Sequence, residues 1–98
     1  MAKYVLIYNG GRAPETQEDK DRVMAAWGQW FESLGDALVD GGNPFGPPKS
    51  IGGDAAEAAT GYSVVEAGDH DAAVELVKGN PMTQESGTRI DVYEAFPM

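Results

Sequence analysis

The residues best suited to chemistry gather around one glycine- and proline-rich stretch, GGNPFGPPKSIGG, at residues 41–53. Asp40 comes directly before it, and Asn43 and Phe45 lie within it. A carboxylate, an amide and an aromatic ring in a stiff loop match the usual make-up of a small-molecule site. We therefore predict one wall of a ligand cleft over residues 40–48, with Asp40 as the candidate general acid or base. The alternative is a turn aspartate that accepts a hydrogen bond from its own backbone before Gly-Gly.

Two other interpretations of this stretch conflict with its prolines. A phosphate loop needs successive backbone N–H groups, but Pro44, Pro47 and Pro48 have none, and Pro-Pro separates Gly46 from the Lys-Ser pair. A flexible linker is equally unsuitable, because proline fixes φ. The remaining interpretation of this stretch is a stiff loop.

Aromatic side chains supply the rest of the predicted cleft. Over residues 16–34, apolar residues recur at helical spacing and share one arc: Val23, Trp27, Trp30, Phe31 and Leu34. This arc predicts core packing, but a large Trp is seldom fully buried, and Trp30 can form the floor of a cleft. Tyr8 and Tyr62 lie on predicted strands, and each hydroxyl needs a partner if buried. We place one of them opposite Trp30.

His70 is the one histidine, and it lies between Asp69 and Asp71 at the start of a second predicted helix. A catalytic role would have these carboxylates hold its tautomer. The alternative is an exposed residue at a helix start, since neighbours in sequence do not face each other on a helix. With one His, no Cys and no spaced carboxylates, no metal site is expected.

Composition excludes several classes of partner. Seven Lys and Arg against sixteen Asp and Glu give a formal charge of −9, without a basic cluster for nucleic acid or an anionic membrane surface. The amino-terminal apolar run, residues 4–8, is too short for a secretory leader or a membrane span. We therefore expect a cytoplasmic protein that binds neither nucleic acid nor membrane.

The order of elements predicts the fold. Strand-like segments at residues 3–8, 37–42, 61–67 and 88–96 alternate with helices at 16–34 and 69–78, and residues 49–53 also have some strand character. This is a single α+β domain over residues 1–98, ferredoxin-like βαββαβ with an antiparallel sheet. Two helices cover one face of such a sheet. The apolar side chains of Val5 and Ile7 on the other face predict a homodimer that stacks sheet on sheet.

Four segments in order, YVLIYNG, LVDGGNPFGP, GYSVVEAGDHDAAVELVKGNP and IDVYEAFPM, resemble the YCII-related (YciI-like, DGPF-associated) family. The resemblance implies a dimeric α+β barrel. Most such proteins are small bacterial proteins of unknown function, and the wider superfamily includes cofactor-independent oxygenases, isomerases and dehalogenating or lyase-type enzymes. Some relatives carry a His–Asp pair, with the His on the first helix and the Asp just after the first strand. In this sequence the two positions fall near Trp30 and Gly10, so both members of the pair are missing there.

Three functions stay open at this point. The first is a binding module for an apolar or weakly polar metabolite, with Tyr8, Trp30, Asp40, Asn43, Phe45 and Tyr62 around an aromatic-lined cleft. The second is a cofactor-independent isomerase, lyase or oxygenase that uses Asp40 or a Tyr hydroxyl for proton transfer. The third is a dimeric interaction protein without a ligand. None of them calls for a cofactor.

Overall fold

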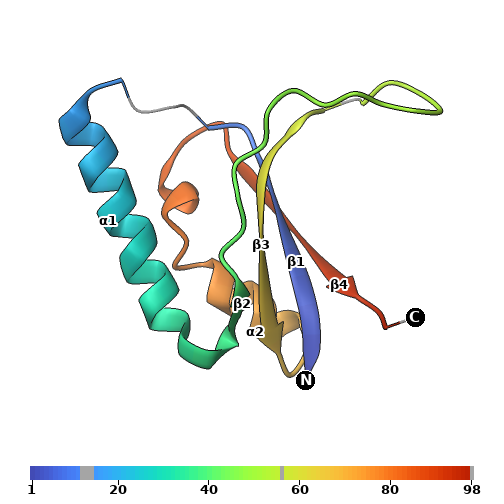
Figure 1. Cartoon of the computed structure of the whole chain (residues 1–98). Coiled ribbons are helices and arrows are strands. Elements are labelled where there is room, and N and C mark those ends of the chain that lie inside the picture. The colour runs from blue at the N-terminus through green and yellow to red at the C-terminus, as the bar shows by residue number, and fades with distance from the viewer. Residues whose placement is uncertain (12–14, 56, 98) are drawn as a thin grey trace.

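The computed structural model describes residues 1–11, 15–55 and 57–97. Its elements follow the predicted order (Figure 1). They are β1 (Ala2–Asn9), α1 (Gln17–Leu34), the 3-10 turn η1 (Gly35–Ala37), β2 (Leu38–Asp40), β3 (Ala59–Ala67), α2 (His70–Val77), the 3-10 turn η2 (Pro81–Gln84) and β4 (Arg89–Ala95). None of the described helices is long and apolar enough to cross a membrane.

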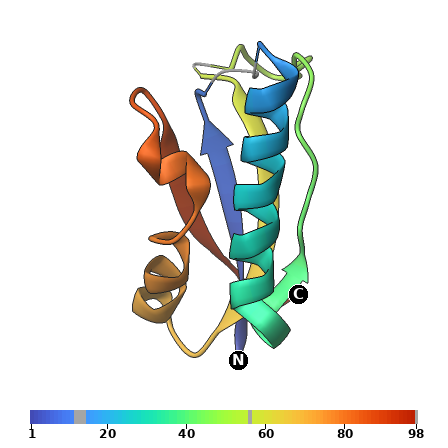
Figure 2. The same ribbon diagram turned by 90° about the vertical axis from the view of Figure 1, so that its left-hand side faces the viewer.

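The four strands form one antiparallel sheet in the order β2-β3-β1-β4. Both helices cover the same face of this sheet, with α1 in front of β1 and β3 when the molecule is viewed from the helix side (Figure 2). The order and the one-sided cover are those of the predicted ferredoxin-like βαββαβ fold. We call the helix-covered side the inner face and the opposite side the outer face.

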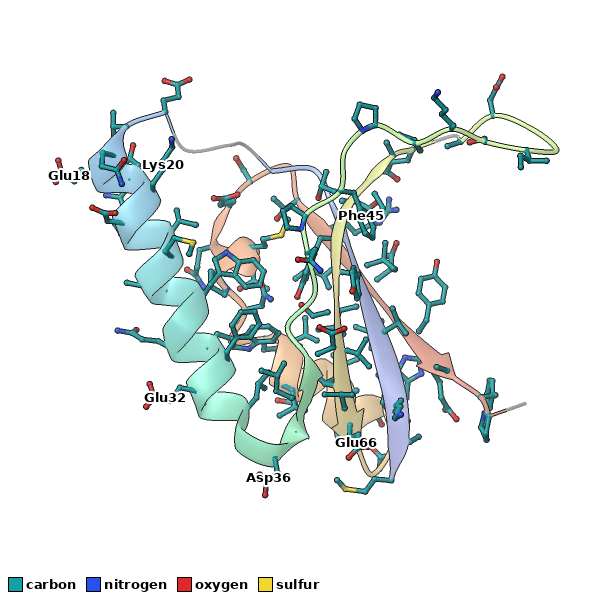
Figure 3. The ribbon with its side chains drawn as sticks, in the orientation of Figure 1. Glu18, Lys20, Glu32, Asp36, Phe45 and Glu66 are labelled. Atoms are coloured by element: carbon teal, nitrogen blue, oxygen red, sulfur yellow. The ribbon has the colours of Figure 1, made fainter. Side chains whose placement is uncertain are left out.

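Local sequence explains where α1 begins and ends. The Thr16 side chain accepts a hydrogen bond from the Asp19 N–H at 3.0 Å, which satisfies one of the free donors of the first turn. Gly35 ends the helix with a positive φ of 54°. Trp30 and Leu34 are buried against the sheet, whereas Figure 3 shows Glu18 and Glu32 pointing away from it.

The two-residue period of the strands divides their side chains between the two faces. Tyr4, Leu6 and Val65 are fully buried on the inner face, where they pack beneath the helices. Val5 and Ile7 lie on the outer face and are only half-buried in the single chain. The core is therefore a single layer between helices and sheet, as expected for a small two-layer domain.

A bulge between Leu38 and Asp40 interrupts the pairing of β2 with β3, and the chain then turns at Gly42. Gly42 has a φ of +78°, and a Cβ atom there would lie 1.6 Å from the Tyr62 carbonyl oxygen, so glycine is required. Pairing then resumes: the Asn43 carbonyl accepts from the Tyr62 N–H at 3.4 Å, and the Phe45 N–H donates to Thr60 at 2.9 Å.

The segment beyond Phe45 departs from the sequence analysis. The predicted strand character of residues 49–53 is wrong: this stretch is exposed and has no strand partner among the described residues. Gly52, whose φ is +89°, and two neighbouring prolines interrupt the regular extended backbone that a strand needs. We call residues Gly46–Ala55 the arm.

Candidate functional site

Three aromatic rings from α1 and one from β1 form a cluster on the inner face. The rings of Trp27 and Trp30 meet edge to face at 5.8 Å between centroids, and Tyr8 meets Trp27 in the same manner at 5.4 Å. Phe31 contacts both tryptophans. Trp30 is 4% exposed, and its indole N–H donates to the Leu76 carbonyl at 3.0 Å, whereas Trp27 is only half-buried. Trp30 is therefore mainly a core residue, and Trp27 supplies the more accessible ring.

A buried polar network fixes the Tyr8 end of this cluster. The Tyr8 hydroxyl donates to Ser63 Oγ at 2.7 Å, which in turn donates to the Gly41 carbonyl at 2.7 Å. Asn80, which has no exposed surface, donates from Nδ2 to the Tyr8 hydroxyl at 3.2 Å and accepts from the Met82 N–H at 2.8 Å. Every member has a partner, so the network holds the Tyr8 ring in one position.

Burial dominates the electrostatics of Tyr8. It raises the pKa of the phenol above its ordinary value of 10.0, while the hydrogen bonds with Ser63 and Asn80 act in the opposite direction. Near neutral pH this hydroxyl is therefore a hydrogen-bond donor and not a base.

A groove of about 560 Å³ runs between α1 and η2, beside the aromatic cluster. Its wall is apolar and its rim is polar. The wall includes Val23, Trp27, Trp30 and Met82, and the rim carries Arg22, Gln29, Gln84 and Glu85. At Gly79, a Cβ atom would lie 3.3 Å from the Trp30 ring, so this glycine lets the chain pass close to the indole. The groove has the size and the mixed lining of a site for a small molecule.

A second, smaller aromatic cluster lies on the outer face. Phe45 stacks on Tyr62 with 5.5 Å between the ring centroids and 18° between their planes (Figure 3 labels Phe45). The Tyr62 hydroxyl donates to Asp40 Oδ2 at 3.4 Å. Asp40 Oδ1 accepts from the Gly42 N–H at 2.8 Å, which confirms the alternative interpretation of Asp40 as a turn aspartate. The exposed residue Asn43 contributes its carbonyl to the pairing with β3.

The six predicted site residues do not surround one cleft in the single chain, and this part of the prediction is corrected. Tyr8 and Trp30 belong to the inner face, whereas Asp40, Phe45 and Tyr62 form the outer cluster. The reason is register: Tyr62 pairs with Ile7 and so shares the face of Ile7, opposite to that of Tyr8. The binding role of each residue stays a prediction.

His70 connects the start of α2 to β4. Its Nε2 lies 2.8 Å from the Val92 carbonyl, which requires the ring to donate from that atom, and its ring centroid lies 5.3 Å from that of Tyr4. Asp69 caps the helix by accepting from the Ala72 N–H at 2.8 Å. His70 is exposed, as the plainer interpretation predicted. Within residues 1–11, 15–55 and 57–97, no group of three His, Asp or Glu side chains is arranged to hold a metal ion.

Sequence reasoning missed Ser63 and Asn80, which are both fully buried. Ser63 alternates with Val65 on one face of a predicted strand, and a hydroxyl between apolar positions on a buried face needs a partner. Asn80 precedes Pro81, the arrangement of a helix cap with proline in the first turn, and here it caps η2. Both signals are present in the sequence, but neither one shows which residue forms the hydrogen bond with the buried polar group.

Comparison with known proteins identifies the family. A model of the YCII-related domain matches residues 2–97. The chain belongs to the YCII-related domain family. No curated protein matches this YCII-related chain. A solved structure that does match is 5-chloro-2-hydroxyhydroquinone dehydrochlorinase from Burkholderia phenoliruptrix AC1100, in complex with 2,5-dihydroxybenzoquinone. The identity is 22%, the match covers 90% of each chain, and the TM-score is 0.52, so the similarity supports the fold.

The two positions that the resemblance assigned to a His–Asp pair have different roles in this YCII-related chain. Trp30 is buried and donates to Leu76, as described above. Gly10 has a φ of +78°, and a Cβ atom there would lie 2.3 Å from the Gly87 carbonyl oxygen, so an aspartate does not fit without a backbone shift.

Proposed function

We propose that this protein binds a small, planar, apolar or weakly polar metabolite in the groove between α1 and η2. The observation that carries the proposal is the half-buried ring of Trp27 in the wall of a groove of about 560 Å³. Tyr8 packs edge to face against that ring, and Tyr8 is itself held by the buried polar network. A ring fixed in advance loses little entropy when a flat ligand stacks on it.

The rim residues suggest what else the ligand carries. Arg22 and Gln29 from α1 stand across the groove from Gln84 and Glu85 at the end of η2. Such groups suit hydroxyl or carbonyl oxygens at the edge of a ring. The structurally similar dehydrochlorinase holds a dihydroxybenzoquinone, a planar ring with oxygens at its edge, which supports this class of ligand.

Calorimetric titration with 2,5-dihydroxybenzoquinone, hydroquinone and benzoate tests the proposal. We expect saturable binding of at least one compound, and loss of at least about fivefold in affinity in Trp27→Ala, because stacking on an aromatic ring contributes about 1 kcal/mol or more beyond its buried area. Phe45→Ala is the matched control, since it removes an exposed aromatic ring from the outer cluster. If Phe45→Ala abolishes binding and Trp27→Ala does not, the ligand binds the outer cluster instead.

A second candidate function rests on the outer cluster. The Tyr62 hydroxyl and the Asp40 carboxylate form a phenol–carboxylate pair, a pair suited to proton transfer in a cofactor-independent isomerase, lyase or oxygenase. Asp40→Asn keeps the shape and removes the basic group. For any substrate found by the titrations, abolished turnover with binding retained supports the enzyme, whereas unchanged turnover refutes a catalytic Asp40.

We also propose that the protein is a homodimer whose two copies meet at their outer faces. Both helices lie on the inner face, and Val5, Ile7 and Val64 remain half-buried on the outer one. A second copy can cover these side chains symmetrically. Sedimentation equilibrium at micromolar concentration should give twice the chain mass of 10.4 kDa. A chain mass of 10.4 kDa under these conditions would contradict the dimer.

A further inference from the structure

The arm, residues Gly46–Ala55, extends away from the body of the domain (Figure 1). Each of its residues is exposed, and Ile51 near its tip is 103% exposed. The domain is correspondingly extended, with a radius of gyration of 14.2 Å and dimensions of 42 × 39 × 20 Å. A compact domain of about 100 residues has a radius of gyration of about 13 Å. The arm therefore has little contact with its own chain.

Both ends of the arm are attached on the side of the outer face. Before it, Phe45 stacks on the outer-face residue Tyr62, and its N–H donates to Thr60. After it, the Glu57 carboxylate pairs with Arg89 at 2.7 Å. Arg89 is two residues from Asp91, which pairs with the outer-face residue Ile7. Figure 1 shows the arm on the opposite side of the sheet from α1.

The composition of the arm suits a fixed contact better than a solvent loop. Pro47 and Pro48 fix φ in its first half, so part of the ordering entropy is lost before any partner binds. A wholly exposed Ile at the tip contributes nothing to the stability of the single chain. Lys49 is the one cation of the arm, and it belongs to a chain with a formal charge of −9.

We propose that the arm clasps a second copy of this chain, with Ile51 packed against the partner. This inference rests on the homodimer proposed above. Stacked sheets lie about 10 Å apart, whereas the six residues Gly46–Ile51 span up to about 20 Å when extended. The arm is thus long enough to pass the facing sheet and reach the partner's flank. Two-fold symmetry makes the contact reciprocal, with two arms per dimer, and each Lys49 meets an acidic partner.

The chain has no cysteine, so single-cysteine variants report directly on this contact. In Ile51→Cys, the rate of reaction with a thiol reagent should fall at least tenfold as the protein concentration rises through the dimer dissociation constant. Met24→Cys is the matched control, because Met24 is 73% exposed on α1, away from the outer face, and its rate should stay constant. A constant rate for Ile51→Cys in a chain that dimerises overturns the clasp.

Dimer affinity gives an independent measurement. Ile51→Asp should raise the dimer dissociation constant by about a hundredfold, because two buried contacts are lost per dimer and each contributes about tenfold. Met24→Asp should leave it within about twofold. If the parent chain is monomeric, the proposed homodimer fails. If the parent dimerises and Ile51→Asp dimerises equally well, only the clasp fails.

Discussion

Replacing Tyr8 by Phe removes one oxygen from the buried network and leaves the ring in place. The phenol oxygen donates to Ser63 and accepts from Asn80, so the variant deprives both residues of a partner. Ser63 still donates to the Gly41 carbonyl. Asn80 loses an acceptor for one amide hydrogen, and a buried donor without a partner costs about 1–3 kcal/mol. We therefore expect the free energy of unfolding to fall by about 2 kcal/mol.

Urea denaturation at one fixed protein concentration measures this change, because the apparent stability of the proposed dimer would depend on concentration. With a slope of about 1 kcal/mol per M for a chain of this size, the midpoint should fall by about 2 M. Tyr93→Phe is the matched control, since it removes the same atom from a ring that is 58% exposed, and its midpoint should barely move. A Tyr8→Phe midpoint equal to that of Tyr93→Phe would refute the network as a source of stability.

Three further predictions concern other parts of the fold. Gly28→Ala should stabilise α1 by about 0.5–1 kcal/mol in thermal denaturation, because open space surrounds this mid-helix position, and a loss of stability would contradict the helix register. Gly42→Ala should destabilise by at least about 2 kcal/mol, since the new methyl group meets the Tyr62 carbonyl and φ is positive; an unchanged denaturation midpoint would rule out this close approach of Gly42 to β3. Burial raises the pKa of Tyr8 and of Tyr4, and the negative charges of Glu94 and Asp69 raise the pKa of Tyr4 further. Above about pH 10 the unfolded chain therefore releases phenol protons that the folded chain keeps, and the free energy of unfolding should fall as the pH rises. A flat stability profile from pH 9 to 11 would contradict the burial of these hydroxyls.

Local signals in the sequence were sufficient for the helices and for the faces of each strand. Thr16 and Asp69 cap the two helices as predicted, and their side chains accept from the N–H groups of Asp19 and Ala72. The apolar arc of α1 also faces the sheet, with Trp30 and Leu34 buried. These features depend on residues within one or two helical turns of each other, which is the range over which periodicity and capping act.

The arrangement of the candidate site depends on contacts that no local pattern contains. Tyr8 and Tyr62 are 54 positions apart, and only the register of β1 with β3 places them on opposite faces. The contact between Tyr8 and Asn80 also depends on the tertiary fold, because the turn after α2 brings Asn80 to the Tyr8 hydroxyl. A one-residue change of register would exchange the faces, and the sequence pattern of either strand alone does not determine it.

The bulge in β2, between Leu38 and Asp40, has a consequence for self-association through sheet edges. An uninterrupted edge strand offers a row of free N–H and C=O groups on which further strands can add, and aggregates grow in this way. Here β2 has only three residues and a bulge within them, and the edge beyond it turns at Gly42 and then meets Pro44, which has no N–H to donate. This edge therefore gives an incoming strand no continuous ladder, so the protein can leave one face of its sheet open to another molecule while discouraging fibre growth along that edge.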